Sequence, residues 1–196
     1  MDKVWTKKIK MNNNINTIIE FLSKEECESI IKKCVDGFDL LDAKTYSESD
    51  VVKLNKKETR KSKVAFIDDL GHINNLVLSK VIEKVKIKGF EPSIETFQFT
   101  KYNEGDYFDW HTDSNDTIFK DRFYTIVIQL NENYTGGNFE LIINNKESKM
   151  EFGVGNLFIF PSNMYHRVKQ IESGIRYSLV SWLKLKEIKN HKKTLL

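Results

Sequence analysis

Residues 102–113, YNEGDYFDWHTD, constrain what this chain can form more than any other stretch. They contain His111 and Asp113, and because alternate side chains of a strand leave the same face, an extended backbone would let both bind one ion. His166 is the remaining candidate for a third ligand, because the other two histidines fall in a helical pattern and in a lysine-rich tail. Two imidazoles and one carboxylate on one side of a metal leave the opposite coordination positions open. A His-x-Asp pair alone is also common as an ordinary hydrogen-bonded pair, so the rest of the pattern matters.

Further residues complete the pattern in a fixed order. Tyr102 lies nine residues before His111, Gly136 and Gly137 form a turn signal, GNLFIFP (155–161) leads to His166, and GIRYS (174–178) closes the pattern. In this order residues 94–183 resemble the prolyl 4-hydroxylase-like branch of the 2-oxoglutarate and Fe(II)-dependent dioxygenases, and residues 20–67 resemble it more loosely. The resemblance is specific for the chemistry and not for the substrate.

This resemblance implies a metal and its co-substrates. His111, Asp113 and His166 would bind Fe(II), and together with Arg176 they form the predicted catalytic set. 2-Oxoglutarate and O2 would be the co-substrates, and ascorbate is a further candidate cofactor. Both cysteines would stay reduced, which suits a ferrous site.

Arg176 is the predicted cation for 2-oxoglutarate. The distal carboxylate of this diacid needs a partner, because an unpaired charge inside a barrel is costly. Arg176 is one of four arginines in a lysine-rich chain, and its planar guanidinium can make two parallel hydrogen bonds to a carboxylate. By resemblance, Tyr102, Ser178 and Gln129 would complete the co-substrate site.

The implied reaction is hydroxylation of an unactivated C–H bond with release of succinate and CO2. The predicted substrate is a prolyl or related residue of a peptide or protein, and a free amino acid or other small molecule is the alternative. From another class, a catalytically silent jelly-roll binding module remains open. A nucleic-acid substrate is disfavoured, because Trp182 stands where the related demethylases place a second arginine, and the net charge is only +3.

Two further residues are predicted to contact the substrate. Arg60 lies in a short Arg-x-Ser segment that resembles one bordering the substrate groove, although it could be a solvated charge at a strand end. Trp110 is the second candidate, with core packing beside the ligands as its alternative. Arg122 begins a predicted strand and could pair with Asp121, Asp116 or Asp113.

The fold class follows from alternating apolar runs. Residues 94–102, 122–130, 138–143, 156–160 and 175–182 alternate as strands do, with glycine and asparagine turns between them. We therefore expect a mainly β protein, a double-stranded β-helix (jelly roll, cupin-like) buttressed by about two helices. At 196 residues, 40% hydrophobic and 30% charged, the chain suits one globular domain over 1–196. The N-terminal support would span about 12–92 and the jelly-roll core about 93–184.

The N-terminal part is predicted to hold a strand within 12–21, two helices and a strand over 60–67. Ser23 and Glu26 form a capping box for a helix over 24–36, whose face carries Cys27 and Cys34 as core residues. These two cysteines lie about 10 Å apart along the helix, too far to bridge. Asp68 or Asp69 would cap a second helix that Gly89 stops after about residue 88, with a surface histidine, His72, upon it.

Two segments have no periodic pattern. Residues 43–63 are polar and are expected to form a long loop or a lid over the substrate. The basic tail, residues 184–196, reads as a solvated end. No signal peptide or transmembrane span is seen, so the expected location is cytoplasmic and away from membranes, while the oligomeric state is left open.

Overall fold

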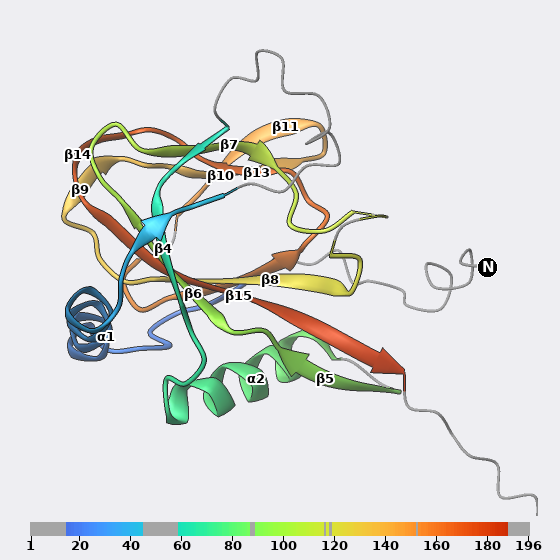
Figure 1. Cartoon of the computed structure of the whole chain (residues 1–196). Helices are drawn as coiled ribbons and strands as arrows, with labels where there is room; N and C mark the ends of the chain where they lie inside the picture. The colour runs from blue at the N-terminus through green and yellow to red at the C-terminus, as the bar shows by residue number, and fades with distance from the viewer. Residues whose placement is uncertain are drawn as a thin grey trace, which may run out of the picture.

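Two antiparallel β-sheets face each other across the molecule (Figure 1). The structure is a computed structural model that describes residues 15–44, 59–86, 89–115, 117, 119–151 and 153–187. Within these residues, the larger sheet runs in the order β1 (Asn16–Ile18), β12 (Leu157–Pro161), β8 (Arg122–Gln129), β15 (Arg176–Glu187), β6 (Phe97–Tyr102), β4 (Lys63–Ile67) and β2 (Leu41–Asp42), and β5 (Phe90–Ile94) pairs with the far part of β15.

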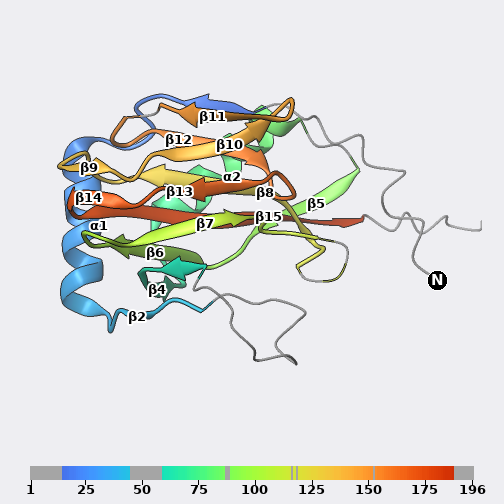
Figure 2. The same ribbon diagram turned by 90° about the horizontal axis from the view of Figure 1, so that it is seen from above.

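The smaller sheet includes three strands that the sequence did not predict. Its order is β11 (Lys146–Met150), β10 (Phe139–Ile143), β13 (His166–Val168), β7 (Tyr107–His111) and β3 (Arg60–Lys61), and β14 (Ile171–Gly174) pairs with β9 (Tyr134–Gly136) as a separate ribbon. The three strands that were not predicted are β7, β11 and β13. Figure 2 shows the strands of both sheets crossing the molecule with α1 along one end. The predicted jelly roll with two helices is confirmed.

Period-two alternation divides the larger sheet's side chains between two cores. Ile126 and Ile128 of β8 pack in the core that includes the helices, whereas Val127 between them packs in the core between the sheets. Each such buried side chain stabilises the fold by roughly 1.5–3 kcal/mol. The alternation therefore fixes which face of each strand is left to build a site.

The two helices cover the face of the larger sheet that points away from the smaller one (Figure 1). α1 (Lys24–Gly37) begins with the predicted capping box: Glu26 N donates to Ser23 Oγ at 3.2 Å, and Ser23 N donates to the Glu26 carboxylate at 2.8 Å. Each bond satisfies a backbone N–H that the first helical turn leaves without a partner. The sequence thus predicted this helix and its start correctly.

Both cysteines of α1 lie in the helix-side core. Cys27 and Cys34 are free thiols with 0% exposure, and burial raises the pKa of each thiol to about 11. They are packing residues, as the sequence predicted.

The second helix is correctly placed, but the prediction of its ends was wrong. α2 (His72–Val85) starts after Gly71, which offers no side-chain cap, and Asp69 instead accepts a hydrogen bond from Gly71 N at 2.6 Å. The helix ends at Val85, before Gly89 is reached, and Lys86 caps it with a left-handed backbone whose N–H donates to Ile82 O. His72 is exposed, as predicted, and lies 3.6 Å from a Glu26 oxygen.

Two predicted strands differ from the structure. The strand expected over 60–67 breaks at Ser62, so that β3 joins the smaller sheet and β4 joins the larger one. The strand expected over 94–102 is β6, which starts only at Phe97, because Glu95 N donates to Trp182 O and separates it from β5. β5 shares only Ile94 with the predicted strand and was not expected from the sequence.

Parts of three predictions lie outside the described residues. These are the lid within 43–63, of which 45–58 is not described, the tail beyond 187, and the start of the first predicted strand before residue 15. The prediction of a solvated tail from residue 184 was wrong for residues 184–187, because they continue β15, pair with β5 and bury Leu185. Neither of the two described helices has the length and apolar character needed to cross a membrane. The predicted boundary near residue 92, between the N-terminal support and the jelly-roll core of a single domain, stays a prediction.

Gly155 fixes the contact between the chain before α1 and the turn before β12. Leu22 N donates to Gly155 O at 2.9 Å, Gly155 has φ +75°, and a Cβ there would collide with the carbonyl of Leu22. We expect Gly155→Ala to lower the free energy of unfolding by about 1–3 kcal/mol from backbone strain alone, and more from the collision. Urea unfolding measures this change.

Gly153→Ala is the matched control in the same turn. A Cβ at Gly153 would lie 3.6 Å from Asn156 Nδ2, an ordinary contact, and its φ is not in the left-handed region. We expect this variant to stay within about 0.5 kcal/mol of the parent. Equal losses in the two variants would show that the Leu22 contact does not decide the cost.

Candidate active site

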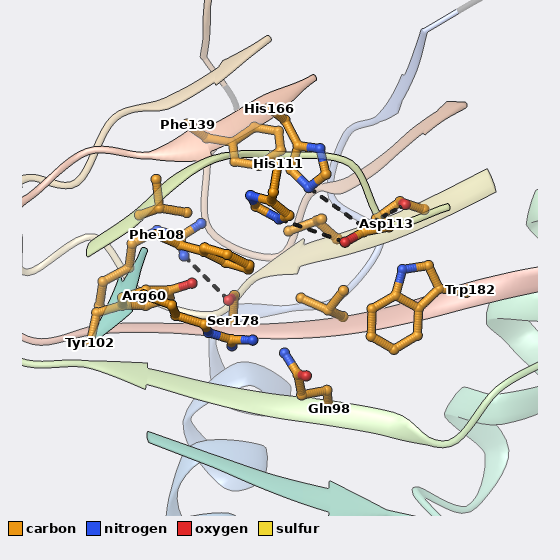
Figure 3. Close-up of a pocket in the computed structure, with 15 residues that line it drawn as sticks. Arg60, Gln98, Tyr102, Phe108, His111, Asp113, Phe139, His166, Ser178 and Trp182 are labelled. Atoms are coloured by element: carbon orange, nitrogen blue, oxygen red, sulfur yellow. Dashed lines mark hydrogen bonds and ion pairs between the residues drawn. The ribbon is translucent and has the colours of Figure 1, made fainter. Parts of the chain in front are cut away.

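Three side chains meet between the two sheets as a candidate metal centre (Figure 3). His111 ends β7, and its register partner His166 begins β13, while Asp113 follows β7 by two residues. His111 Nε2 lies 3.6 Å from Asp113 Oδ1, and His166 Nε2 lies 3.5 Å from Asp113 Oδ2. One ligand atom from each residue lies within 4.8 Å of the other two, so the set can share one ion.

Backbone carbonyls orient both imidazoles for metal binding. His111 Nδ1 lies 2.8 Å from Asp109 O, and His166 Nδ1 lies 2.9 Å from Met164 O. A carbonyl only accepts hydrogen bonds, so each Nδ1 carries the proton and each Nε2 keeps a free lone pair. The Nε2 atoms are the ones that face Asp113, so the tautomers fit a metal between them.

A β-bulge in β7 directs His111 and Phe108 into the same pocket. The register passes from His166↔His111 to Val168↔Phe108, so three steps along β7 match two along β13. The Phe108 ring stacks on the His111 imidazole, with centroids 3.4 Å apart and 11° between planes. Arg60 packs on Phe108 with its guanidinium carbon 4.5 Å from the ring centroid. The side chains of Arg60 and Phe108 therefore support the imidazole of His111 as a stack.

Thr125 supports Asp113 from β8. Its hydroxyl donates to Asp113 Oδ2 at 2.7 Å, and Ser162 Oγ lies 3.0 Å from the same hydroxyl. Asp113 N also donates to Ser162 O at 2.9 Å. These bonds hold the carboxylate after the strand has ended.

The protonation states of His111 and Asp113 suit a bound cation. Burial, followed by the neighbouring His166, lowers the pKa of His111 to about 3, although Asp113 opposes this shift. Burial opposes ionisation of Asp113, but the adjacent His166 and His111 outweigh this effect and hold its pKa well below its usual range. At neutral pH the site therefore presents a neutral His111 and a carboxylate, the protonation states that bind a metal.

Arg176 is buried at the other end of the same pocket. It is 2% exposed, its NH1 donates to Ser178 Oγ at 3.3 Å, and its NH2 donates to Gln129 Oε1 at 2.9 Å. The Tyr102 ring centroid lies 5.6 Å from the guanidinium carbon. All the residues predicted for an acid-binding end are therefore together, although Gln129 holds Arg176 without lining the metal pocket.

Strand alternation builds the walls of this pocket, a cavity of about 60 Å³. β15 contributes every second residue, namely Arg176, Ser178, Val180 and Trp182, and β8 contributes Thr125 and Val127 in the same way. The alternation predicted from sequence could have identified Trp182 and Thr125, because each shares a face with a residue already assigned to the site. They were missed because neither belongs to the recognised motif.

Trp182 is held in place by Arg122, which pairs with neither Asp121 nor Asp113, two of the three partners predicted from the sequence. Arg122 makes two hydrogen bonds to Glu95, at 2.8 and 2.7 Å, and lies between the rings of Phe119 and Trp182 at 3.8 and 3.7 Å. Asp121 pairs with Lys184 instead, Asp113 with the histidines, and Asp116 is outside the described residues.

The two predicted substrate contacts differ in position. Arg60 lines the pocket beside Phe108. Trp110 is not among the lining residues, and its ring packs 4.3 Å from the guanidinium of Arg167, which pairs with Glu140. The prediction for Trp110 therefore has no support from its position.

One buried donor in this pocket fits a bound acceptor. Arg176 Nε is buried and has no hydrogen-bond partner among the described residues. Trp182, which also lines the pocket, interacts with the Asp113 carboxylate and helps to hold its pKa low. Unpartnered buried donors are costly, so an acceptor bound beside Arg176 would stabilise it.

Known proteins share both the sequence pattern and the fold. A family model described as the 2OG-Fe(II) oxygenase superfamily matches residues 97–184. A PKHD-type hydroxylase of Prochlorococcus marinus (strain MIT 9312) is 30% identical over 173 residues, which cover 84% of this chain and 75% of that protein. Alignments with PKHD-type hydroxylases of three other strains of that species span only 52%, 59% and 62% of their length.

Solved structures agree with the fold. A prolyl-4-hydroxylase from Pseudomonas putida has a TM-score of 0.65 at 20% identity, covering 88% of this chain and 93% of its own. A prolyl hydroxylase from Trichoplax adhaerens, in complex with a hypoxia inducible factor oxygen degradation domain peptide fragment, has a TM-score of 0.66 at 18% identity. This second match covers 88% of this chain and 84% of that one.

Thr125→Val tests the support of Asp113. The change removes the hydroxyl donor and nearly keeps the side-chain shape, so we expect divalent-metal affinity to fall about 10–100-fold. Anaerobic calorimetric titration with Fe(II) or Mn(II) measures it, and Thr125→Ser should retain the affinity. If the valine variant binds metal as tightly as the parent, the hydroxyl does not position the carboxylate.

Proposed function

Because this chain belongs to the 2OG-Fe(II) oxygenase superfamily, on its prolyl 4-hydroxylase-like branch, we propose that it hydroxylates an unactivated C–H bond and converts 2-oxoglutarate to succinate and CO2. Fe(II), 2-oxoglutarate and O2 are the metal and co-substrates that the family implies. The proposed catalytic residues are His111, Asp113, His166 and Arg176.

One observation carries the proposal: a single pocket holds both the three-ligand set and a buried arginine without a carboxylate partner. No salt bridge to Arg176 occurs among the described residues, and its Nε has no hydrogen-bond partner. A buried guanidinium without an anion is costly, so the pocket fits an acidic ligand. A diacid could pair one carboxylate with Arg176 and place its other end at the three metal-ligand residues.

The residues of the acid end would bind and orient the co-substrate. Arg176 would pair with the distal carboxylate, and Gln129 and Ser178 already hold its guanidinium in place. Tyr102 lies on the neighbouring strand as the register partner of Arg176, where its hydroxyl could donate to the same carboxylate. These contacts with the distal carboxylate would direct the opposite, 2-oxo acid end of 2-oxoglutarate toward the metal.

His111, Asp113 and His166 would hold the iron on one side and leave its remaining positions open to ligands. When bound, Fe(II) with 2-oxoglutarate and O2 supplies the oxidative chemistry. The chain's own task is to orient the ligands and exclude water. The buried surroundings of His166, at 4% exposure, and the stack of Phe108 on His111 serve this purpose.

The proposed substrate is a prolyl or related residue of a peptide or protein. The similarity to a prolyl hydroxylase whose structure contains a peptide fragment supports it. Arg60, on β3 beside the pocket, is the residue we propose to contact the substrate, and Trp110 is not favoured because its ring packs on Arg167. A free amino acid remains the alternative.

Removing a metal ligand tests the reaction class. We expect His111→Ala and Asp113→Ala to abolish iron-dependent succinate formation while circular dichroism shows a folded protein, because two ligands hold the ion poorly. Turnover at the parental rate in either purified variant would refute the ligand assignment.

Removing Arg176 tests the co-substrate site. We expect Arg176→Ala to weaken 2-oxoglutarate binding by about 2–5 kcal/mol, roughly 30- to 5,000-fold, because one partner of a buried charge pair is lost. Anaerobic titration of the Fe(II) protein, followed by its weak visible absorption band, measures this affinity. An unaltered affinity would mean that another cation holds the carboxylate.

The substrate is identified by a screen. Proline-containing peptides and free amino acids are tested for stimulated succinate release, and the products are weighed by mass spectrometry for one added oxygen atom. Stimulation by peptides and not by free proline supports the proposed substrate class. Stimulation by free amino acids alone would assign the small-molecule alternative.

A further inference from the structure

The outer face of the smaller sheet carries a set of paired side chains directly behind the two metal histidines. Trp110 precedes His111 on β7, and Arg167 follows His166 on β13. Neither Trp110 nor Arg167 lines the metal pocket, and the Arg167 guanidinium carbon lies 4.3 Å from the centroid of the Trp110 ring. The two side chains therefore stack on each other on the side of the strands that faces away from the pocket.

Two carboxylates anchor Arg167 to the neighbouring strands. Its Nε donates to Glu140 Oε2 at 2.7 Å, and its NH2 donates to Glu147 Oε2 at 2.9 Å. Glu140, on β10, is the register partner of Arg167 and is only 8% exposed, and Glu147 lies on β11. Figure 2 shows β7, β13, β10 and β11 side by side, so these contacts cross four adjacent strands. We call Trp110, Arg167, Glu140 and Glu147 the outer brace.

The backbone pairing beside the histidines is short. β13 pairs with β7 at two register positions, His166↔His111 and Val168↔Phe108, with the bulge between them. β7 ends at His111 and β13 begins at His166, so the paired positions stop at the two metal ligands. β3, on the other side of β7, has Tyr107 and Phe108 as its register partners. The outer brace therefore supplies side-chain contacts where the strand ladder is interrupted and then ends.

Trp110 also lies within the backbone segment that orients His111. The carbonyl oxygen of Asp109 accepts the hydrogen bond from His111 Nδ1 at 2.8 Å, and the Asp109 carboxylate accepts one from Trp110 N at 2.9 Å. Rotation of the backbone at Trp110 would move this carbonyl relative to the imidazole. The stack with Arg167 holds the Trp110 side chain, and it therefore restricts this rotation.

From these contacts we propose that Arg167 and Trp110 are positioning residues of the metal centre. Their stack, anchored by the two carboxylates of the outer brace, holds β7 against β13 so that Nε2 of both histidines stays directed at one ion. A guanidinium suits this role, because its planar face contacts the ring while its N–H groups bind carboxylates. The inference rests on the proposed function of the metal site and adds residues outside the pocket to it.

Trp110→Leu tests the stack while the ion pairs of Arg167 remain. Residues that orient metal-binding histidines commonly affect affinity about 10- to 100-fold, so we expect the affinity for Fe(II) or Mn(II) to fall at least about tenfold. Anaerobic calorimetric titration measures it. Trp110→Phe keeps an aromatic face for the guanidinium, so its affinity should stay within about threefold of the parent.

Arg167→Lys tests the anchor. Lysine keeps a positive charge beside Glu140 but lacks the planar group that stacks and binds two carboxylates, so we again expect a loss of about tenfold or more. Lys149→Ala is the matched control on the same sheet. Lys149 is the register partner of Glu140 on β11, pairs with Glu151 at 3.2 Å, and makes no ion pair with the outer brace among the described residues. We expect this control to bind metal as tightly as the parent.

A second measurement separates positioning from a purely structural role. Urea unfolding of each metal-free variant is measured beside its metal affinity. A structural role alone would lower the free energy of unfolding and leave the metal affinity of the folded protein unchanged. A positioning role also changes the visible absorption spectrum of the Co(II)-loaded protein, which reports ligand geometry, in Trp110→Leu and Arg167→Lys but not in Trp110→Phe.

The outcomes separate this inference from the proposed function. If folded Trp110→Leu and Arg167→Lys both bind metal within about threefold of the parent and keep its Co(II) spectrum, the inference is wrong. The same holds if Lys149→Ala loses as much affinity as they do, because the effect would then belong to the whole sheet. If one of the two variants fails to fold, the other decides. Failure of the parent to bind Fe(II) or Mn(II) would instead overturn the proposed function.

Discussion

The register of β15 is the constraint on which the site depends. This strand lies in the middle of the larger sheet, between β6 and β8. Alternate residues from Arg176 to Trp182 face the pocket, while Leu179 and Leu183 pack in the helix-side core. Because strand side chains alternate with period two, a slip of one residue would place leucines in the pocket and the arginine against the helices. The packing of the helix-side core therefore fixes the position of the Arg176 guanidinium.

The two sheets contribute different residues to the site. The smaller sheet supplies His111 and His166 from adjacent strands, and the larger sheet supplies Arg176 and, through Thr125, the support of Asp113. Facing sheets pack about 10 Å apart. The sheet spacing would then set the length of a molecule that joins a metal bound by the histidines and Asp113 to the Arg176 guanidinium. Stability and specificity come from the same packing.

Much of this could be predicted from the sequence, because local chemistry determines it. The capping box, the strand alternation and the ordered ligand motif each lie within a short segment and have direct physical meanings. The predictions that were wrong concern residues whose partners are distant in the sequence. Arg122 pairs with Glu95, 27 positions away, and no local sequence pattern indicates that pairing. The strand over 60–67 was predicted as one element because its break at Ser62 reflects two sheets competing for neighbouring residues. Thr125 was overlooked because its role appears only once the strands are paired.

The strands before the motif also complete both sheets. β1 pairs with β12 although about 140 residues separate them, and β3 and β4 extend the smaller and the larger sheet respectively. A fragment that kept only residues 93–184 would expose the edges of β12, β7 and β6, and unpaired strand edges invite aggregation. We therefore expect a fragment that carries all three proposed metal ligands to form an incomplete barrel that aggregates. The segment by which the family is identified would then depend on the preceding residues for its folding.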